Sequence, residues 1–172
     1  MRRGDLKSES LKVQWNFYER AVNNYSIIMR IMNGIDSCEG LVKRMPKVFV
    51  EESFFDMCKV ILEGNGSTRE GFYSIDSTED DIDGSSVLMK HANCTAPAII
   101  DDAFGYGVVY IYPLRKGVRI IGFILLGKKY YMDIELRFLR ELEIVCEIYN
   151  KALILNTYGH YLQQDSEEKT TF

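Results

Sequence analysis

The sequence predicts an α+β protein in which a central antiparallel sheet has long N- and C-terminal helices packed on one face. Apolar residues recur at helical spacing near both ends of the chain, whereas apolar runs rich in strand-forming residues cluster in the middle. Hydrophobic residues make up 47% of the 172 residues and only 3 are Pro, as is typical of one domain with its own core. Because the predicted strands follow one another along the chain, we expect them to pair as antiparallel neighbours.

The first predicted helix runs from about Leu11 to Ile35. Seven apolar residues in it are spaced alternately four and three apart, which is the pattern of a helix seam. A second apolar line lies on another face, so we expect the helix to touch both its own sheet and a partner helix. A single wide stripe that faces one core is the alternative. The seam consists of Leu11, Trp15, Tyr18, Val22, Tyr25, Met29 and Met32.

The last predicted helix starts with Asp133 as its N-cap and continues beyond Leu155. Its apolar residues repeat the same spacing of four and three. We expect two chains to join around a twofold axis, so that a homodimer buries the N-terminal seam together with Tyr149. The predicted organisation is a disordered segment at 1–10, a domain with both flanking helices at 11–155, and a helix extension with a polar tail at 156–172.

Between these helices the spacing of the apolar residues changes. A shorter helix is expected at 39–50, broken or started near Pro46. The strongest hairpin joins strands at 107–114 and 119–126 through the tight turn 115–118. The remaining expected elements are strands at 54–62, 71–75 and 98–101, a polar loop at 76–84, and a short helix from an N-cap at Ser85 to His91.

The strand at 107–114 alternates aliphatic and aromatic residues. Val109 and Ile111 point to one face, and Tyr110 and Tyr112 point to the other, because successive strand side chains alternate. The pattern does not say which of the two faces meets the helices. Gly122, inside the next strand, predicts a bulge or a close backbone approach.

Two stretches carry a family resemblance. Residues 112–127 contain a Pro-Leu pair, a short basic turn and a strand with a central glycine, and the helix after Asp133 follows them. Residues 87–103 contain a small helix, a turn, Pro97 and a hydrophobic strand that ends in Asp101. Together with the element order, these stretches resemble the GAF domains of bacterial sensor kinases, transcription activators and nucleotide cyclases over about 11–155. The resemblance implies a GAF/PAS-like fold and a non-catalytic sensory or regulatory module in signal transduction, such as the input domain of a histidine kinase or a transcription regulator.

The resemblance also implies where a small-molecule effector would bind, namely between the sheet and the segment at 87–104. The short connection from Asp102 to Pro113 implies a small or open pocket, or none. The family's cyclic-nucleotide signature is absent from 127–135, and no Cys-His pair suited to bilin attachment is present, so no cofactor is expected. The residues expected nearest to a ligand are Tyr110, Tyr112, His91, Asp101, Phe104 and Met89.

Catalysis is not expected, and no catalytic residue is assigned. GAF-like methionine sulfoxide reductases use cysteine thiolates, which must be accessible and close to a second cysteine. Of Cys38, Cys58, Cys94 and Cys146, only Cys94 falls in a loop. No Ser-His-Asp arrangement, phosphate-binding loop or GxGxxG motif is present either. The alternatives to a sensory module are therefore a structural dimerisation domain without a ligand and a cysteine-dependent reductase.

Charge and composition bear on the expected partners. A net charge of −4 argues against a direct nucleic-acid surface. The N-terminus has no apolar signal region and the apolar runs are short, so a cytoplasmic protein without membrane insertion is expected. No metal is expected, because on an EF-hand template starting at Glu79 the final ligand position falls on Lys90. The expected partners are a second copy of the chain, a small-molecule effector, and an output domain or partner signalling protein.

Overall fold

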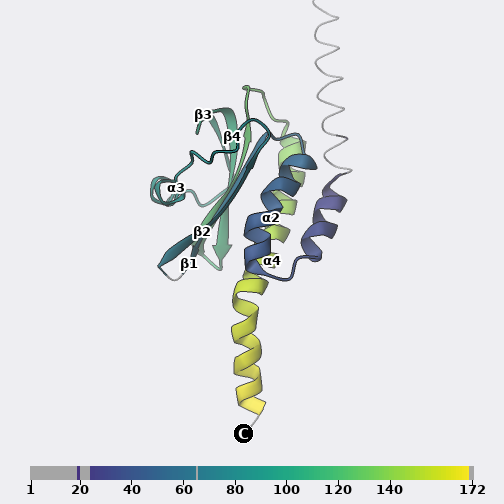
Figure 1. The fold of residues 1–172 in the computed structure, drawn as a ribbon, viewed down its shortest axis with the longest axis vertical. Coiled ribbons are helices and arrows are strands. Elements are labelled where there is room, and N and C mark those ends of the chain that lie inside the picture. Colours follow the sequence, from purple (N-terminus) through teal and green to yellow (C-terminus); the bar gives the residue numbers. More distant parts are fainter. Residues whose placement is uncertain (1–18, 20–23, 65, 171–172) are drawn as a thin grey trace, which may run out of the picture.

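The computed structural model describes residues 19, 24–64 and 66–170, with side chains as far as Thr157. Five strands form one antiparallel sheet in the order β2-β1-β5-β4-β3, which confirms the predicted α+β fold. The helix at residues 24–33, α2 (Cys38–Glu51) and α4 (Leu136–Thr170) lie on one face of the sheet (Figure 1). The short helix α3 (Gly84–Lys90) lies on the opposite face of the sheet.

The strands form the hairpin β1–β2 and a β3–β4–β5 meander, in which Phe104 and Gly105 make the β3–β4 turn with positive φ values of 57° and 82°. β1 pairs with β2, and β4 pairs with β5 through the predicted turn at Gly117 and Val118, where Gly117 has a positive φ of 63°. The first strand begins later than predicted because Phe54 and Phe55 pack their rings around Phe138 of α4. The bounds are β1 Met57–Gly64, β2 Ser67–Ser74, β3 Ala98–Ala103, β4 Tyr106–Lys116 and β5 Arg119–Lys128.

Gly122 confirms both features predicted for it. The register between β4 and β5 shifts between Leu114 and Arg115, which places an irregularity beside Gly122. A Cβ atom on Gly122 would lie 2.0 Å from the carbonyl oxygen of Ile61 in β1. The close approach of two backbones therefore requires glycine here.

Helix α2 runs unbroken through Pro46, so the predicted break or start at this residue is wrong. Proline has no N–H, and the carbonyl of Val42 one turn earlier is therefore denied its usual helix bond. The backbone of β2 packs against this carbonyl, since a Cβ atom on Gly71 would lie 1.7 Å from the Val42 oxygen. Ser37, which accepts from the Gly40 N–H at 3.0 Å, caps the start of the helix.

Two predicted helix caps are wrong. Asp83, not Ser85, is the N-cap of α3, because its carboxylate accepts from the Ser85 N–H at 3.1 Å. Helix α4 starts at Leu136, and its first backbone bond runs from the Leu139 N–H to the Glu135 carbonyl. Asp133 instead accepts from the Tyr131 hydroxyl at 2.7 Å.

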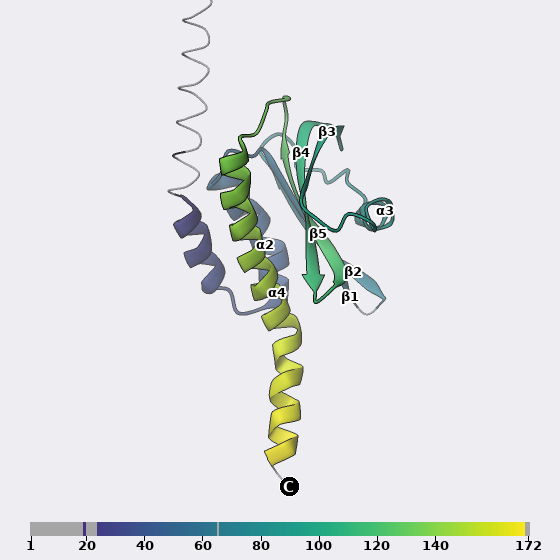
Figure 2. The same ribbon diagram turned by 180° about the vertical axis from the view of Figure 1, so that it is seen from behind.

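The sheet separates two hydrophobic clusters, one on each face. We call the face covered by α2 and α4 the helix face, and the opposite one the α3 face; the helix at 24–33 lies on the outer side of α2 and α4 (Figures 1 and 2). The helix-face cluster includes Ile28, Met32, Leu41, Met45, Phe49, Leu142 and Tyr149, together with Tyr110. The α3-face cluster consists of Met57, Ile61, Ile82, Val87, Val109, Ile111, Phe123 and Leu125.

The predicted dimer seam is only partly within the described residues. Leu11, Trp15, Tyr18 and Val22 lie outside them. Tyr25, Met32 and Tyr149 are buried in the chain's own core, and Met29 is half-buried. The Tyr149 hydroxyl donates to the Leu41 carbonyl at 2.7 Å. These three buried residues therefore hold the helices on their own sheet and are not available to a partner. Among the described helices, none is both long and apolar enough to cross a bilayer.

Candidate functional site

The structure does not assemble the ligand site that the family resemblance implied. His91 and Phe104 do come together on the α3 face, with ring centroids 6.0 Å apart. Met89 is exposed on α3, and Asp101 is exposed on the edge strand β3. Eight buried side chains of the α3-face cluster pack in the space between the sheet and α3.

Tyr110 and Tyr112 lie on the opposite side of the sheet from His91. Both belong to the helix-face cluster, where Tyr110 is buried and Tyr112 is half-buried. The predicted sharing of one face by the two tyrosines is confirmed, but that face is the one covered by α4. The six residues assigned to one ligand site are therefore divided between two faces.

A buried lysine stabilises the α3 face. Lys59 is 1% exposed and lies in β1 between the buried residues Met57 and Ile61. Its ammonium forms ion pairs with the carboxylates of Asp80 and, at 3.3 Å, Glu70. A buried charge is tolerated only when it is paired, so these contacts hold the acidic loop on the sheet. The sequence reasoning missed Lys59, although a charged residue inside the apolar run 54–62 was a usable signal.

Three carboxylates of the acidic loop at 76–84, those of Asp76, Asp80 and Asp83, make contacts within the protein. Asp80 also accepts from the Ile82 N–H at 3.1 Å, and Asp83 caps α3. Within the described ranges, no group of three or more His, Cys, Asp or Glu residues is arranged to hold a metal ion. The loop therefore serves as a cover for the α3 face.

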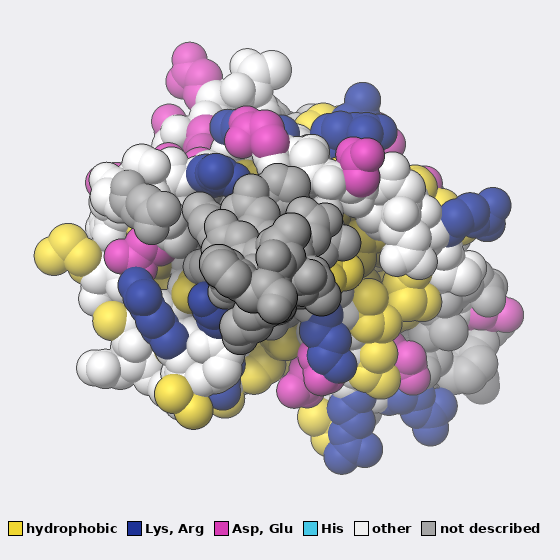
Figure 3. All heavy atoms as spheres, turned by 90° about the horizontal axis from the view of Figure 1, so that it is seen from below, with side chains coloured by type: hydrophobic (Ala, Val, Ile, Leu, Met, Phe, Trp, Pro, Cys, Tyr) yellow, Lys and Arg dark blue, Asp and Glu magenta, His cyan; other side chains and the backbone are white. Residues whose placement is uncertain are grey.

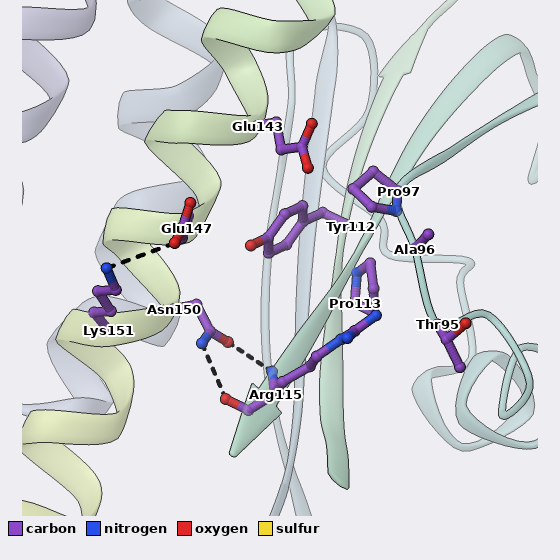
Figure 4. A pocket seen from close by; sticks show the side chains of 10 residues that line it. All are labelled: Thr95, Ala96, Pro97, Tyr112, Pro113, Arg115, Glu143, Glu147, Asn150 and Lys151. Carbon is purple, nitrogen blue, oxygen red and sulfur yellow. Dashed lines mark hydrogen bonds and ion pairs between the residues drawn. The ribbon is translucent and has the colours of Figure 1, made fainter. Parts of the chain in front are cut away.

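The helix face contains an open groove between α4, the end of β4 and the segment before β3 (Figure 4). Its volume is about 600 Å³, within the usual range for small-molecule sites. In Figure 4 the Tyr112 ring lies across the groove, with Glu143 at one end and the Arg115 side chain running toward Pro113 at the other. The lining residues are Thr95, Ala96, Pro97, Tyr112, Pro113, Arg115, Glu143, Glu147, Asn150 and Lys151.

Asn150 joins α4 to the sheet at the floor of this groove. Pairing between β3 and β4 ends at Ala98 and Ile111, so β4 lacks a strand neighbour on this side beyond that point. The Arg115 N–H donates to Asn150 Oδ1 at 2.7 Å, and Asn150 Nδ2 donates to the Arg115 carbonyl at 2.9 Å. The side-chain amide thus takes the place of a neighbouring strand, and it fixes the register of α4 on β4. The spacing of apolar residues in α4 gave no sign of this polar contact.

A smaller hollow of about 180 Å³ continues the groove along α4 and shares Pro97 and Glu143 with it. Tyr110 lines this hollow, and its buried hydroxyl has no hydrogen-bond partner among the residues that the structure describes. Burial raises the pKa of Tyr110 well above its usual value and that of Tyr112 to about 12. Both hydroxyls are therefore neutral hydrogen-bond donors at physiological pH.

The cysteines are divided between the two faces and none is paired. Cys38, Cys58 and Cys146 are buried in the helix-face cluster, and burial raises the pKa of the Cys58 and Cys146 thiols. Cys94 is half-buried against the α3-face cluster, and its thiol donates to the Ala96 carbonyl at 3.2 Å. The sheet therefore separates the most accessible thiol from the other three.

Similarity to known proteins was found by comparing structures and not by comparing sequences. No family model matches the sequence, and no curated protein matches it. The GAF domain from a phosphoenolpyruvate-protein phosphotransferase of Coxiella burnetii is 10% identical, with a TM-score of 0.61 over 86% of this chain and 98% of that one. The second GAF domain of DevS from Mycobacterium smegmatis is 12% identical, with a TM-score of 0.56 over 73% and 99% of the two chains.

A third similar structure is an enzyme. The free methionine-R-sulfoxide reductase from Neisseria meningitidis, solved in complex with its substrate, is 11% identical and has a TM-score of 0.60. The match covers 83% of this chain and 91% of the reductase. At such identities the similarity concerns the fold and not the site. The strand order, the helix positions and these matches together show that the chain has the fold of a GAF domain.

Proposed function

We propose that the chain is a regulatory module without chemistry of its own, which acts as a homodimer and passes the effect of a ligand or partner through its terminal helices. The observation that carries this proposal is the double role of α4. Its first half packs on the sheet through residues such as Phe138, Leu142 and Leu153, and the 35-residue helix then projects beyond the domain (Figure 2). An output domain or a partner signalling protein is the expected receiver at that end.

Specific contacts support the coupling of α4 to the sheet. Tyr149 bonds to the Leu41 carbonyl of α2, and Asn150 bonds to both backbone groups of Arg115. A shift of β4 would therefore change the position of α4. Regulation through this route requires an effector that binds one helix arrangement more tightly than another.

Exposed apolar residues on one side of α4 support the dimer. Ile144 is 52% exposed and Leu155 is 70% exposed, and the half-buried Ile148 lies between them. Their separations of four and seven residues place all three along one side of the helix. Figure 3 views the end from which α4 projects, where acidic, basic and hydrophobic side chains are interspersed on the surface. Such a side is suited to a second copy of the chain rather than to a strongly charged partner.

The dimer can be tested by multi-angle light scattering over a concentration series. The wild type is expected to be dimeric, and the double variant Ile144→Glu, Leu155→Glu is expected to be a folded monomer, because like charges would meet across the interface. Val118→Glu is the matched control, since Val118 is an exposed hydrophobic residue in the β4–β5 turn and does not belong to α4. A wild type that remains monomeric at the highest concentration would contradict the proposal.

A cysteine-dependent methionine sulfoxide reductase is the second candidate, and the Neisseria meningitidis structure is the observation that favours it. That chemistry needs a reactive thiolate near a resolving cysteine. Here Cys94 lies on the α3 face, whereas the other three thiols lie on the helix face. Incubation with free methionine sulfoxide and a thiol reductant is expected to give no methionine, and turnover that is lost in Cys94→Ser would establish the reductase instead.

A structural dimerisation domain without a ligand is the remaining candidate. It would share the light-scattering result, so a different measurement is needed. A thermal-shift screen of small molecules separates the two functions, because a ligand that binds only the folded state raises the melting temperature.

A further inference from the structure

Two of the four charged side chains that line the groove on the helix face form no ion pair with the other two. Of its four charged side chains, Glu147 and Lys151 form an ion pair with each other at 3.5 Å. Within the described residues, neither Arg115 nor Glu143 takes part in an ion pair. The groove therefore has one free cation and one free anion.

These two free charges lie at opposite ends of the groove, with the Tyr112 ring between them (Figure 4). Glu143 is seven residues before Asn150, which is about 10.5 Å along the helix axis. Asn150 in turn holds the backbone of Arg115. The backbone of Arg115 is thus held about 10 Å along α4 from that of Glu143, and a ligand that meets both charges must carry an ammonium and a carboxylate separated by a distance of that order.

We propose that this groove binds a short peptide with free termini, whose ammonium pairs with Glu143 and whose carboxylate pairs with Arg115. A free amino acid is too short, because it carries both charges on one carbon atom. An extended chain advances about 3.3–3.6 Å per residue, so about three residues span the distance. Arginine binds a carboxylate through two parallel N–H donors, which suits a C-terminal carboxylate.

The uncharged lining fits the rest of such a ligand. The Tyr112 ring, Pro97 and Pro113 offer apolar surface for side chains. The Tyr110 hydroxyl in the adjoining hollow has no partner in the described part of the chain, and a peptide carbonyl or polar side chain would supply an acceptor. Arg140 also lines that hollow, so the ammonium belongs on the side of Glu143 that faces the larger groove.

Occupancy of this site would act directly on α4. Glu143 and Asn150 both belong to α4, whereas Arg115 and Tyr112 belong to β4. A bound peptide would therefore bridge the sheet and the helix that projects from the domain. This regulatory consequence rests on the proposed function, but peptide binding does not. A wild type that is monomeric and still binds peptide would contradict the regulatory consequence and leave the proposed peptide site standing.

The test uses a pool of tripeptides with free termini, the same pool with acetylated N-termini, and the same pool with amidated C-termini. Binding is followed by amide chemical shifts in an NMR titration of the full chain. The free pool is expected to bind, and each blocking group is expected to weaken binding about tenfold, since each removes one charge-assisted contact. Absence of binding by the free pool at millimolar concentration, or equal binding of all three pools, would overturn the proposal.

Two substitutions test which residue binds each terminus of the peptide. Glu143→Gln should abolish the penalty for acetylation and leave the penalty for amidation, and Arg115→Gln should do the reverse. Glu135→Gln and Arg119→Gln are matched controls, because both residues are exposed and neither lines the groove. If Arg115→Gln fails to fold, the comparison of the three pools on the wild type still tests whether both free termini contribute to binding. Variants that leave both penalties unchanged would contradict the assignment.

Discussion

The two faces of the sheet differ in how far their polar side chains are paired. On the α3 face, the one buried charge of the cluster, Lys59, is matched by two carboxylates, and apolar side chains fill the remaining space. On the helix face, the Tyr110 hydroxyl is buried without a partner, and Arg115 and Glu143 line a groove without an ion pair among the described residues. Since an unsatisfied buried group costs stability, it is a better guide to a ligand site than a satisfied one.

The contrast also concerns connectivity. The α3 face is covered by a loop and one short helix between β2 and β3, whereas the helix face carries the helix that projects from the domain. A ligand on the α3 face would reach α4 only through the sheet. A ligand on the helix face would touch α4 itself, which makes this face the more direct starting point for a signal.

The largest expected effect is on the α3 face. Asp80→Ala leaves Lys59 buried with only Glu70 as a partner, and it should lower the free energy of unfolding by about 3 kcal/mol. Lys59→Met should cost only about 1 kcal/mol, because the remaining carboxylates of Asp80 and Glu70 are partly exposed and can be hydrated. Urea denaturation at neutral pH measures both values.

Asp76→Ala is the control for this prediction. Asp76 belongs to the same loop, but its ion pair with Lys129 is exposed, and the loss should be about 0.5 kcal/mol. An Asp80→Ala variant no less stable than Asp76→Ala would mean that the Lys59 pair does not hold the loop.

A smaller effect is expected on the helix face. Asn150→Ala removes both bonds to the Arg115 backbone and should lower the free energy of unfolding by about 1–2 kcal/mol. Asn156→Ala is the matched control on the same helix, because Asn156 donates only to the Ala152 carbonyl within α4 and its loss should be close to zero. Equal losses in the two variants would show that Asn150 does not join α4 to the sheet.

Local patterns in the sequence predicted much of the fold. The β4–β5 hairpin was predicted because alternating apolar residues flank a turn with Gly117, and a bulge or a close backbone approach was predicted because Gly122 lies inside a strand. Apolar spacing predicted helix α4 and the described helix at 24–33, whereas the predicted start at Leu11 lies outside the described residues. The errors at Pro46, Ser85 and Asp133 have a common physical cause, because tertiary contacts and neighbouring side chains decide where a helix is interrupted or capped.

The candidate site was harder to predict. Alternation shows that Tyr110 and Tyr112 share a face, but the position of the helices decides which face that is, and this is a property of the whole fold. The contacts of Lys59 with Asp80 and of Asn150 with Arg115 join residues 21 and 35 positions apart. No periodicity links such pairs, so only the structure could bring them together.

Backbone amide hydrogen exchange tests most directly the claim that the helix face, and not the α3 face, is coupled to α4. The comparison uses the wild type, Asp80→Ala and Asn150→Ala at one pH and temperature. Asp80→Ala is expected to increase exchange in residues 76–90 and to leave α4 unchanged, whereas Asn150→Ala is expected to increase exchange at the end of β4 and along α4 and to leave α3 unchanged. Increased exchange along α4 in Asp80→Ala, equal to that in Asn150→Ala, would contradict the account.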